Sequence, residues 1–141
     1  MDFESYDLND NDIYFSGERS LAISSEQMYI NLLDIPVIQL AGDLQPIKID
    51  FSTMFYAKSN LANRSPIIVC SMENQGQNLM YQTYKPQIDK ANSWNAFNYT
   101  FNIYIIPEKT AQLKLYIWNK DKAVFNMDDL NITISTIDPN H

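Results

Sequence analysis

Alternation of apolar and polar residues with a period of two is the feature that most constrains this chain. It is clear between residues 46 and 57, and it returns at 96–106, 112–119 and 129–136. A β-strand places successive side chains on opposite faces of its sheet, whereas a helix needs a period of 3.6. The alternation therefore predicts strands that each turn one face towards a core.

Polar segments such as 73–77 and 119–122 separate these runs, and helical periodicity has only one weak candidate, at 25–33. Strands without intervening helices are typical of antiparallel sheets packed as a sandwich. The sequence therefore predicts an all-β fold, a two-sheet antiparallel β-sandwich of the jelly-roll kind. The expected strands lie near 19–24, 27–32, 36–40, 46–57, 66–73, 77–84, 96–106, 112–119, 123–127 and 129–136.

The length of 141 residues fits one domain with its own core. We expect a poorly defined leader or first strand at 1–15, a single β-sandwich domain at 16–137 and a short tail at 138–141. The acidic start of the chain does not read as a signal peptide. The longest apolar runs are a few residues, against the roughly 20 that a membrane helix needs. We therefore expect no membrane insertion.

Charge and composition exclude several function classes. Ten Lys and Arg residues stand against seventeen Asp and Glu, and a net charge of -7 repels nucleic acids and anionic lipids. The one histidine is His141, so a catalytic triad lacks its base and a zinc site lacks its ligands. We expect no enzyme activity, although spacing alone cannot test a carboxylate pair for glycoside hydrolysis. Cys70 lies in an apolar run, which predicts a buried, inert thiol.

The second half of the chain carries a connected pattern of motifs. It runs through Trp94, Phe97-x-Tyr99-x-Phe101, Ile106-Pro107, Leu113-Lys114-Leu115-Tyr116-Ile117-Trp118-Asn119 and Met127-Asp128-Asp129-Leu130-x-Ile132. This pattern resembles the C-terminal strands of bacterial jelly-roll domains with a galactose-binding-domain-like fold. Calcium-containing carbohydrate-binding modules belong to that group. The opening Phe3-Glu4 and the stretch 16–21, Ser-Gly-Glu-Arg-Ser-Leu, are similar to the first strands of the same group.

The resemblance implies a structural calcium ion where the opening strand meets the closing one. Glu4 matches the glutamate of the group's opening, and Asp129, or Asp128 if the register slips by one, matches the aspartate before its last strand. Backbone carbonyls near 17–20 would supply further oxygens. Adjacent residues of a strand point to opposite faces, so only one of the two aspartates can easily join such a site. A solvated turn before the last strand is the alternative.

The strand at 112–119 separates a core face from a candidate ligand face. Leu113, Leu115 and Ile117 are aliphatic and predict core, whereas the opposite face holds Lys114, Tyr116 and Trp118. Flat aromatic rings beside polar groups suit a sugar, whose C–H face stacks while its hydroxyls need hydrogen bonds. Neighbouring strands could add Tyr104 and Tyr84. The alternative places Trp118 in the core or at a strand end.

Two further expectations concern single residues. We expect Trp94, at the start of a long strand, to cap one end of the core. Asn119 follows Trp118 and suits a turn, since asparagine tolerates left-handed backbone angles.

Two functions follow. The first is a non-catalytic carbohydrate-binding-like module, linked to other domains in a larger secreted or cell-surface protein, with an oligo- or polysaccharide as partner. The second is an accessory structural or protein-interaction sandwich of an envelope protein, without a glycan site. Contiguous exposed aromatic residues on one sheet would favour the first, and a plain polar face the second.

Overall fold

The computed structural model describes residues 3–9, 12–17, 21–36, 46–61, 63–104 and 111–137, with the backbone alone for 3–9, 12–17 and 136. In this part of the chain all regular structure is β-strand, and no helix is long and apolar enough to cross a membrane. The larger sheet holds β1 (Phe3–Asn9), β2 (Asp12–Gly17), β3 (Leu21–Ile23), β5 (Ile47–Ala57), β8 (Ser93–Ile103) and β10 (Phe125–Thr136). The smaller sheet holds β4 (Tyr29–Pro36), β6 (Ile67–Asn74), β7 (Gln77–Tyr84) and β9 (Gln112–Trp118).

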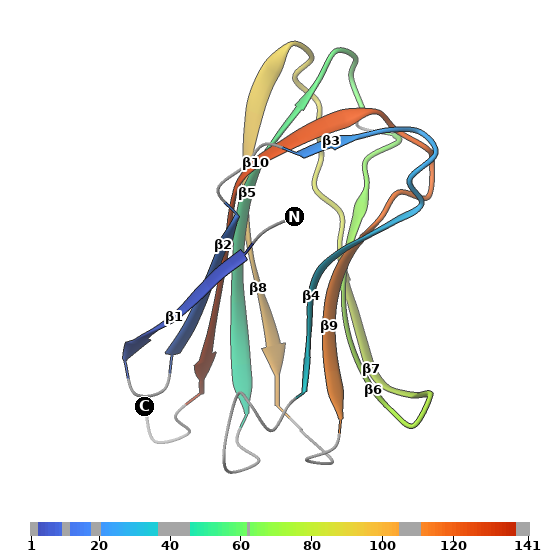
Figure 1. Ribbon diagram of the computed structural model, residues 1–141. Helices are drawn as coiled ribbons and strands as arrows, with labels where there is room; N and C mark the ends of the chain where they lie inside the picture. Colours follow the sequence, from blue (N-terminus) through green and yellow to red (C-terminus); the bar gives the residue numbers. More distant parts are fainter. Residues whose placement is uncertain are drawn as a thin grey trace.

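The two sheets pack face to face as a sandwich (Figure 1). The strand order is β1-β2-β10-β5-β8 in the larger sheet, with β3 also pairing with β10, and β4-β9-β6-β7 in the smaller one. Each of these pairings is antiparallel. From β3 onward the chain crosses repeatedly between the sheets, as a jelly roll requires. The predicted all-β, two-sheet antiparallel sandwich is therefore confirmed.

The core fills the space between the sheets, and the period-two alternation produces it. Along β5 the buried residues alternate with half-exposed ones, and Phe51 and Phe55 are fully enclosed. The Phe55 ring meets Phe125 of β10 edge to face, with 5.3 Å between ring centroids. On β9 the predicted core residues Leu113, Leu115 and Ile117 are all buried.

Several strand boundaries differ from the expectation. The two strands expected at 123–127 and 129–136 form one continuous strand, β10. The stretch expected as a leader or first strand forms β1 and most of β2, and β2 pairs with β10. The strand expected at 36–40 lies almost wholly outside the described residues.

A β-bulge explains why β10 looked like two strands. Asp128 pairs with Met54 and Asn131 with Ser52, so two residues of β10 face Thr53 alone. Asp129 takes a positive φ of 51° there, and Thr53 Oγ1 donates a hydrogen bond of 2.9 Å to the Asp128 carbonyl. The extra residue shifts the side-chain phase of the strand. Met127 before the bulge and Leu130 after it consequently both reach the core.

The edge strands β7 and β8 close one side of the sandwich. The rings of Tyr84 and Tyr99 stack across the gap between the sheets, 4.3 Å apart and 12° from parallel. Gln82 Nε2 donates a hydrogen bond of 2.9 Å to the Asn102 carbonyl nearby. Side chains, in place of a backbone ladder, therefore join the two sheets at this edge.

Candidate functional site

The candidate site lies on the outer face of the smaller sheet, where β9 runs between β4 and β6. Because the odd-numbered residues of β9 fill the core, the even-numbered ones point outward. Lys114, Tyr116 and Trp118 are accordingly half-buried on the outer face. The structure brings these three predicted residues together on one surface.

Aromatic rings gather around Trp118 and Tyr116. Tyr29 of β4 pairs with Trp118 and is 62% exposed, so its ring is open to a ligand. Its ring lies nearly parallel to Trp118, 13° and 6.4 Å away, and meets Tyr116 edge-on at 6.1 Å. Lys120 Nζ lies 5.7 Å above the Trp118 ring. With Tyr81 of β7, which is 51% exposed, these rings form what we call the aromatic face: Tyr29, Tyr81, Tyr116 and Trp118.

An ion pair lies in the middle of this surface. Lys114 Nζ is 2.5 Å from Glu73 Oε1 of β6, and each side chain is about one-third exposed. The hydrogen bond with Glu73 is the main cause that raises the pKa of Lys114; the nearby charges of Glu73 and Asp34 also raise it, against a smaller opposing effect of burial. The pair presents both a donor and an acceptor to a ligand while adding no net charge.

A shallow hollow of about 340 Å³ follows the ion pair across the sheet. It is lined by Tyr29, Asn31, Ser71, Glu73, Asn78, Tyr81, Lys114 and Tyr116. Burial is the main cause that raises the pKa of Tyr116, and the neighbouring Tyr81 raises it further. A ligand with many hydroxyl groups could form hydrogen bonds with the hydroxyls, amides and ion pair of this hollow, while the aromatic rings contact its apolar parts.

The other predicted ligand residues lie elsewhere. Tyr84 pairs with Ile68 of β6 and points between the sheets, where it stacks on Tyr99. Tyr104 follows β8 of the larger sheet and is 67% exposed. The structure therefore brings neither tyrosine to the aromatic face.

Two members of the aromatic face, Tyr29 and Tyr81, were not among the predicted ligand residues. Tyr81 faces outward because the β6–β7 hairpin sets it opposite Ser71. The hairpin has a two-residue turn in which Gln75 and Gly76 both have positive φ, 52° and 79°, followed by a β-bulge in β7 that shifts the register by one residue. A Gln-Gly step between two alternating runs is a recognisable hairpin signal, but the turn alone would set Tyr81 opposite the buried Cys70, so only the bulge brings it to the outer face.

The predicted capping role of Trp94 is wrong. Trp94 is 43% exposed and lies on the outer face of the larger sheet, with its ring 5.5 Å from Tyr56. The residue that turns inward there is Asn95, which is buried and donates hydrogen bonds to the carbonyls of Lys90 and Ser93 at 3.1 and 3.0 Å.

The residues named for calcium lie at the bulge of β10 and on β1. Asp128 Oδ1 accepts a hydrogen bond of 2.8 Å from the backbone N–H of Asp129, whose own side chain is exposed. Glu4 pairs with Ser16 of β2, and β2 separates β1 from β10, so about two strand spacings, roughly 10 Å, lie between the backbones. Among residues with described side chains, no three His, Cys, Asp or Glu converge. These carboxylates alone fall short of the about six to eight oxygens that calcium prefers.

Comparisons with known proteins identify the fold. No protein-family model and no curated protein matches the chain. Among solved structures, that of the infectious bursal disease virus Gx strain matches with a TM-score of 0.54 and 10% identity, over 94% of this chain and 34% of that one. The VP2 subviral particle of the same virus matches with 0.52 and 11%, over 90% and 33%.

The chain therefore has a jelly-roll sandwich similar to one in these viral proteins, and it spans about a third of their length. At such identities the likeness concerns the fold alone. The arabinose-bound MgGH51 α-L-arabinofuranosidase matches with a lower TM-score, 0.41, at 11% identity over 87% of this chain and 17% of that one. The galactose-binding-domain or carbohydrate-binding-module family expected from the sequence is not identified by these comparisons.

Proposed function

We propose that the chain is a non-catalytic module that binds a neutral oligo- or polysaccharide on its aromatic face. The observation that carries the proposal is the contiguity of Tyr29, Tyr116 and Trp118, joined by Tyr81, on the outside of one sheet. A chain in water gains nothing from exposing several large rings together unless they meet a partner.

The chemistry of the hollow supports a sugar over other partners. Among the described residues that line it, the charged ones are Lys114 and Glu73, which neutralise each other. An anionic ligand therefore gains little there and also meets a net charge of -7. Amide and hydroxyl groups of Asn31, Ser71 and Asn78 can bond sugar hydroxyls while the rings stack on C–H faces. An open surface orders its ligand without enclosing it, so we expect weak binding.

A second part of the proposal concerns the larger protein that contains the module. We propose that it is a part of a larger secreted or cell-surface protein, in which it holds a neighbouring domain near a polysaccharide. A binding module with weak affinity per site gains from such linkage, because a second tethered contact raises the overall affinity.

Tyr81→Ala is the primary test. The probes are cellohexaose, laminarihexaose, mannohexaose and xylohexaose, each titrated calorimetrically. Because Tyr81 is half exposed, its removal should lower affinity about tenfold or more while thermal unfolding stays nearly unchanged. Tyr104→Ala, an exposed tyrosine on the other sheet, is the matched control and should bind as the wild type does. Absence of binding to all four probes, or equal losses in both variants, would refute the proposal.

Trp118→Ala is a second test with two readouts. Loss of binding with the fold intact supports the ligand role of the ring. Unfolding of the domain would instead mean that the half-buried indole serves the core, which contradicts its place in the site.

The accessory or protein-interaction sandwich is the second candidate. The likeness to the infectious bursal disease virus proteins, one of them described as a subviral particle, supports it through the fold. Sedimentation velocity over a range of protein concentrations tests it. Concentration-dependent assembly together with no saccharide binding would favour this candidate over the first.

A further inference from the structure

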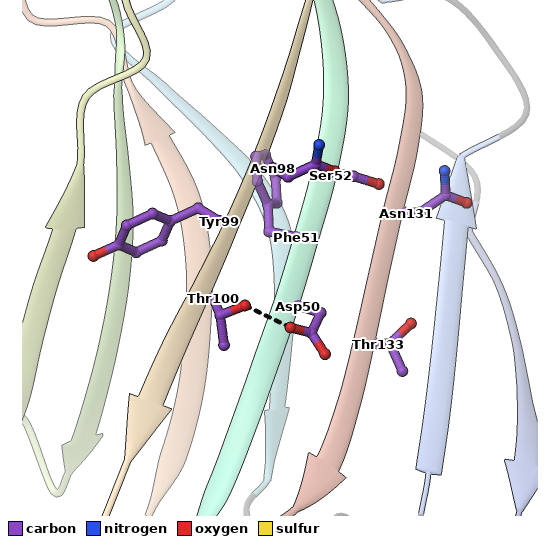
Figure 2. A pocket seen from close by; sticks show the side chains of 8 residues that line it. All are labelled: Asp50, Phe51, Ser52, Asn98, Tyr99, Thr100, Asn131 and Thr133. Atoms are coloured by element: carbon purple, nitrogen blue, oxygen red, sulfur yellow. Dashed lines mark hydrogen bonds between the residues drawn. The ribbon is translucent and has the colours of Figure 1, made fainter.

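The outer face of the larger sheet carries a second hollow, on the opposite side of the sandwich from the aromatic face. Figure 2 shows its lining residues over β5, β8 and β10. The hollow has a volume of about 200 Å³. Two rows of paired residues cross these strands there. One row is Asn98, Ser52 and Asn131, and the next is Thr100, Asp50 and Thr133.

The side chains that line this second hollow are mostly polar, and several of them are available for hydrogen bonds with a ligand. Thr100 Oγ1 donates a hydrogen bond of 2.6 Å to Asp50 Oδ1, which fixes the carboxylate (Figure 2). Within the part of the chain whose side chains are described, the side chains of Ser52, Asn98 and Thr133 make no hydrogen bond to protein. They therefore offer donors and acceptors to whatever fills the hollow.

The charge of the hollow restricts the ligand. Of the described residues that line the hollow, Asp50 is the single charged one and none is a lysine or arginine, so an anion is repelled. A single carboxylate on a flat sheet does not make a site for a hard cation, which needs several converging oxygens. A neutral ligand rich in hydroxyl groups satisfies amides, hydroxyls and one fixed carboxylate together.

An aromatic platform lies on the same face and the same two strands. Trp94 pairs with Tyr56, four residues along β5 from Ser52, and their rings lie 5.5 Å apart. Four residues of strand measure roughly 14 Å, so one extended chain of several sugar rings can reach both platform and hollow. The 43% exposure of Trp94 leaves its indole accessible for stacking.

We propose that this surface is a second saccharide-binding face, with Trp94 and Tyr56 as the stacking platform and Asp50, Ser52, Asn98 and Thr133 as the hydrogen-bonding hollow. The class of ligand rests on the proposed function of the aromatic face, whereas the site itself rests on its own residues. With one binding face on each side of the sandwich, the module joins two saccharide chains.

The two tryptophans of the chain make the test direct, because Trp118 reports the aromatic face and Trp94 the second face. Their two indole N–H signals in a ¹⁵N-labelled sample are assigned with Trp94→Phe and Trp118→Phe. Cellohexaose, laminarihexaose, mannohexaose and xylohexaose are then titrated separately. We expect at least one of them to move both signals, and hexagalacturonate, an acidic probe, to move neither.

The outcomes separate the two proposals. Movement of Trp118 alone overturns the second face and leaves the aromatic face standing, and movement of Trp94 alone does the reverse. No movement with any of the four neutral probes overturns both. Asn98→Ala should weaken the response of Trp94 about tenfold and leave that of Trp118 unchanged. Asn63→Ala, an exposed asparagine in a loop, is the matched control and should change neither response. An undiminished Trp94 response in Asn98→Ala overturns the assigned hollow.

Discussion

Replacing Asn119 with alanine should destabilise the fold strongly, because this side chain holds together the turn after β9. Asn119 is fully buried. Its Oδ1 accepts a hydrogen bond of 2.9 Å from the Ala123 N–H, and its Nδ2 donates to the carbonyls of Ala123 at 2.9 Å and Ser24 at 3.3 Å. Asn119→Ala removes all three bonds, so the N–H and carbonyl of buried Ala123 lose these partners, whereas the Ser24 carbonyl still accepts from the Gln27 N–H at 3.2 Å.

The expected magnitude follows from those bonds. Each lost bond to a buried group costs about 1 kcal/mol or somewhat more, so the free energy of unfolding should fall by about 3 kcal/mol. An unfolding entropy of about 2.1 cal/mol/K for each of 141 residues then places the midpoint about 10 °C lower. Urea denaturation and thermal melting both measure this, under two-state conditions.

Two further variants sharpen the test. Asn63→Ala, on an exposed loop, should cost no more than about 0.5 kcal/mol. Asn119→Asp keeps the acceptor for Ala123 but sets an oxygen against two carbonyls, so it should also be destabilised at neutral pH. A loss in Asn119→Ala no larger than that of Asn63→Ala would refute this account of the turn.

Three other predictions can be checked with standard assays. Burial raises the pKa of Cys70 to about 12, so Ellman's reagent should leave it unmodified at pH 8 in the native protein and titrate one thiol in urea; fast native reaction would contradict this. The Lys114–Glu73 pair is partly exposed, so Glu73→Gln should cost under about 1 kcal/mol at pH 7. The pKa of Lys114 is higher in the folded protein than in the unfolded chain, so the stability difference between wild type and Glu73→Gln should be fully present at pH values below the pKa of the unfolded chain. It should disappear as the pH rises through the pKa of Lys114 in the folded protein. A stability difference that persists at higher pH argues against the pair. The calcium implied by the resemblance predicts a higher melting temperature in excess calcium than in chelator, and equal midpoints would make Glu4 and Asp129 ordinary surface acids.

Local alternation was enough to predict which face of a strand is buried. Leu113, Leu115 and Ile117 are buried in the core, whereas Lys114 and Tyr116 point outward. This alternation can be predicted because successive side chains of any single strand point to opposite faces of its sheet. The same reasoning placed Tyr84 beside Tyr116, although each belongs to a different face of the smaller sheet. Placing residues of two strands on one surface requires their pairing register, which depends on turns and tertiary contacts.

Two misjudged residues show the same limit at single positions. Trp94 was expected to cap the core, but the alternation of side chains along β8 places Trp94 on the outer face and Asn95 on the inner one. Asn119 was expected to serve as a turn residue with left-handed backbone angles. The left-handed position is taken by Lys122, at a φ of 55°, while Asn119 acts through its buried side chain. Only the packed structure shows which backbone groups an amide can reach.

The central place of β10 in the larger sheet has a consequence for how the chain folds. This strand comes last in the sequence of strands, yet it pairs with β5 on one side and with β2 and β3 on the other. Ile134, for instance, pairs with Ile49, more than half the chain earlier. Closing such long loops precedes the gain from the contacts, which makes folding slow. During synthesis, β5 and β2 must wait with unpaired edges until β10 leaves the ribosome, and a nascent chain stalled before β10 is then open to pairing with other chains.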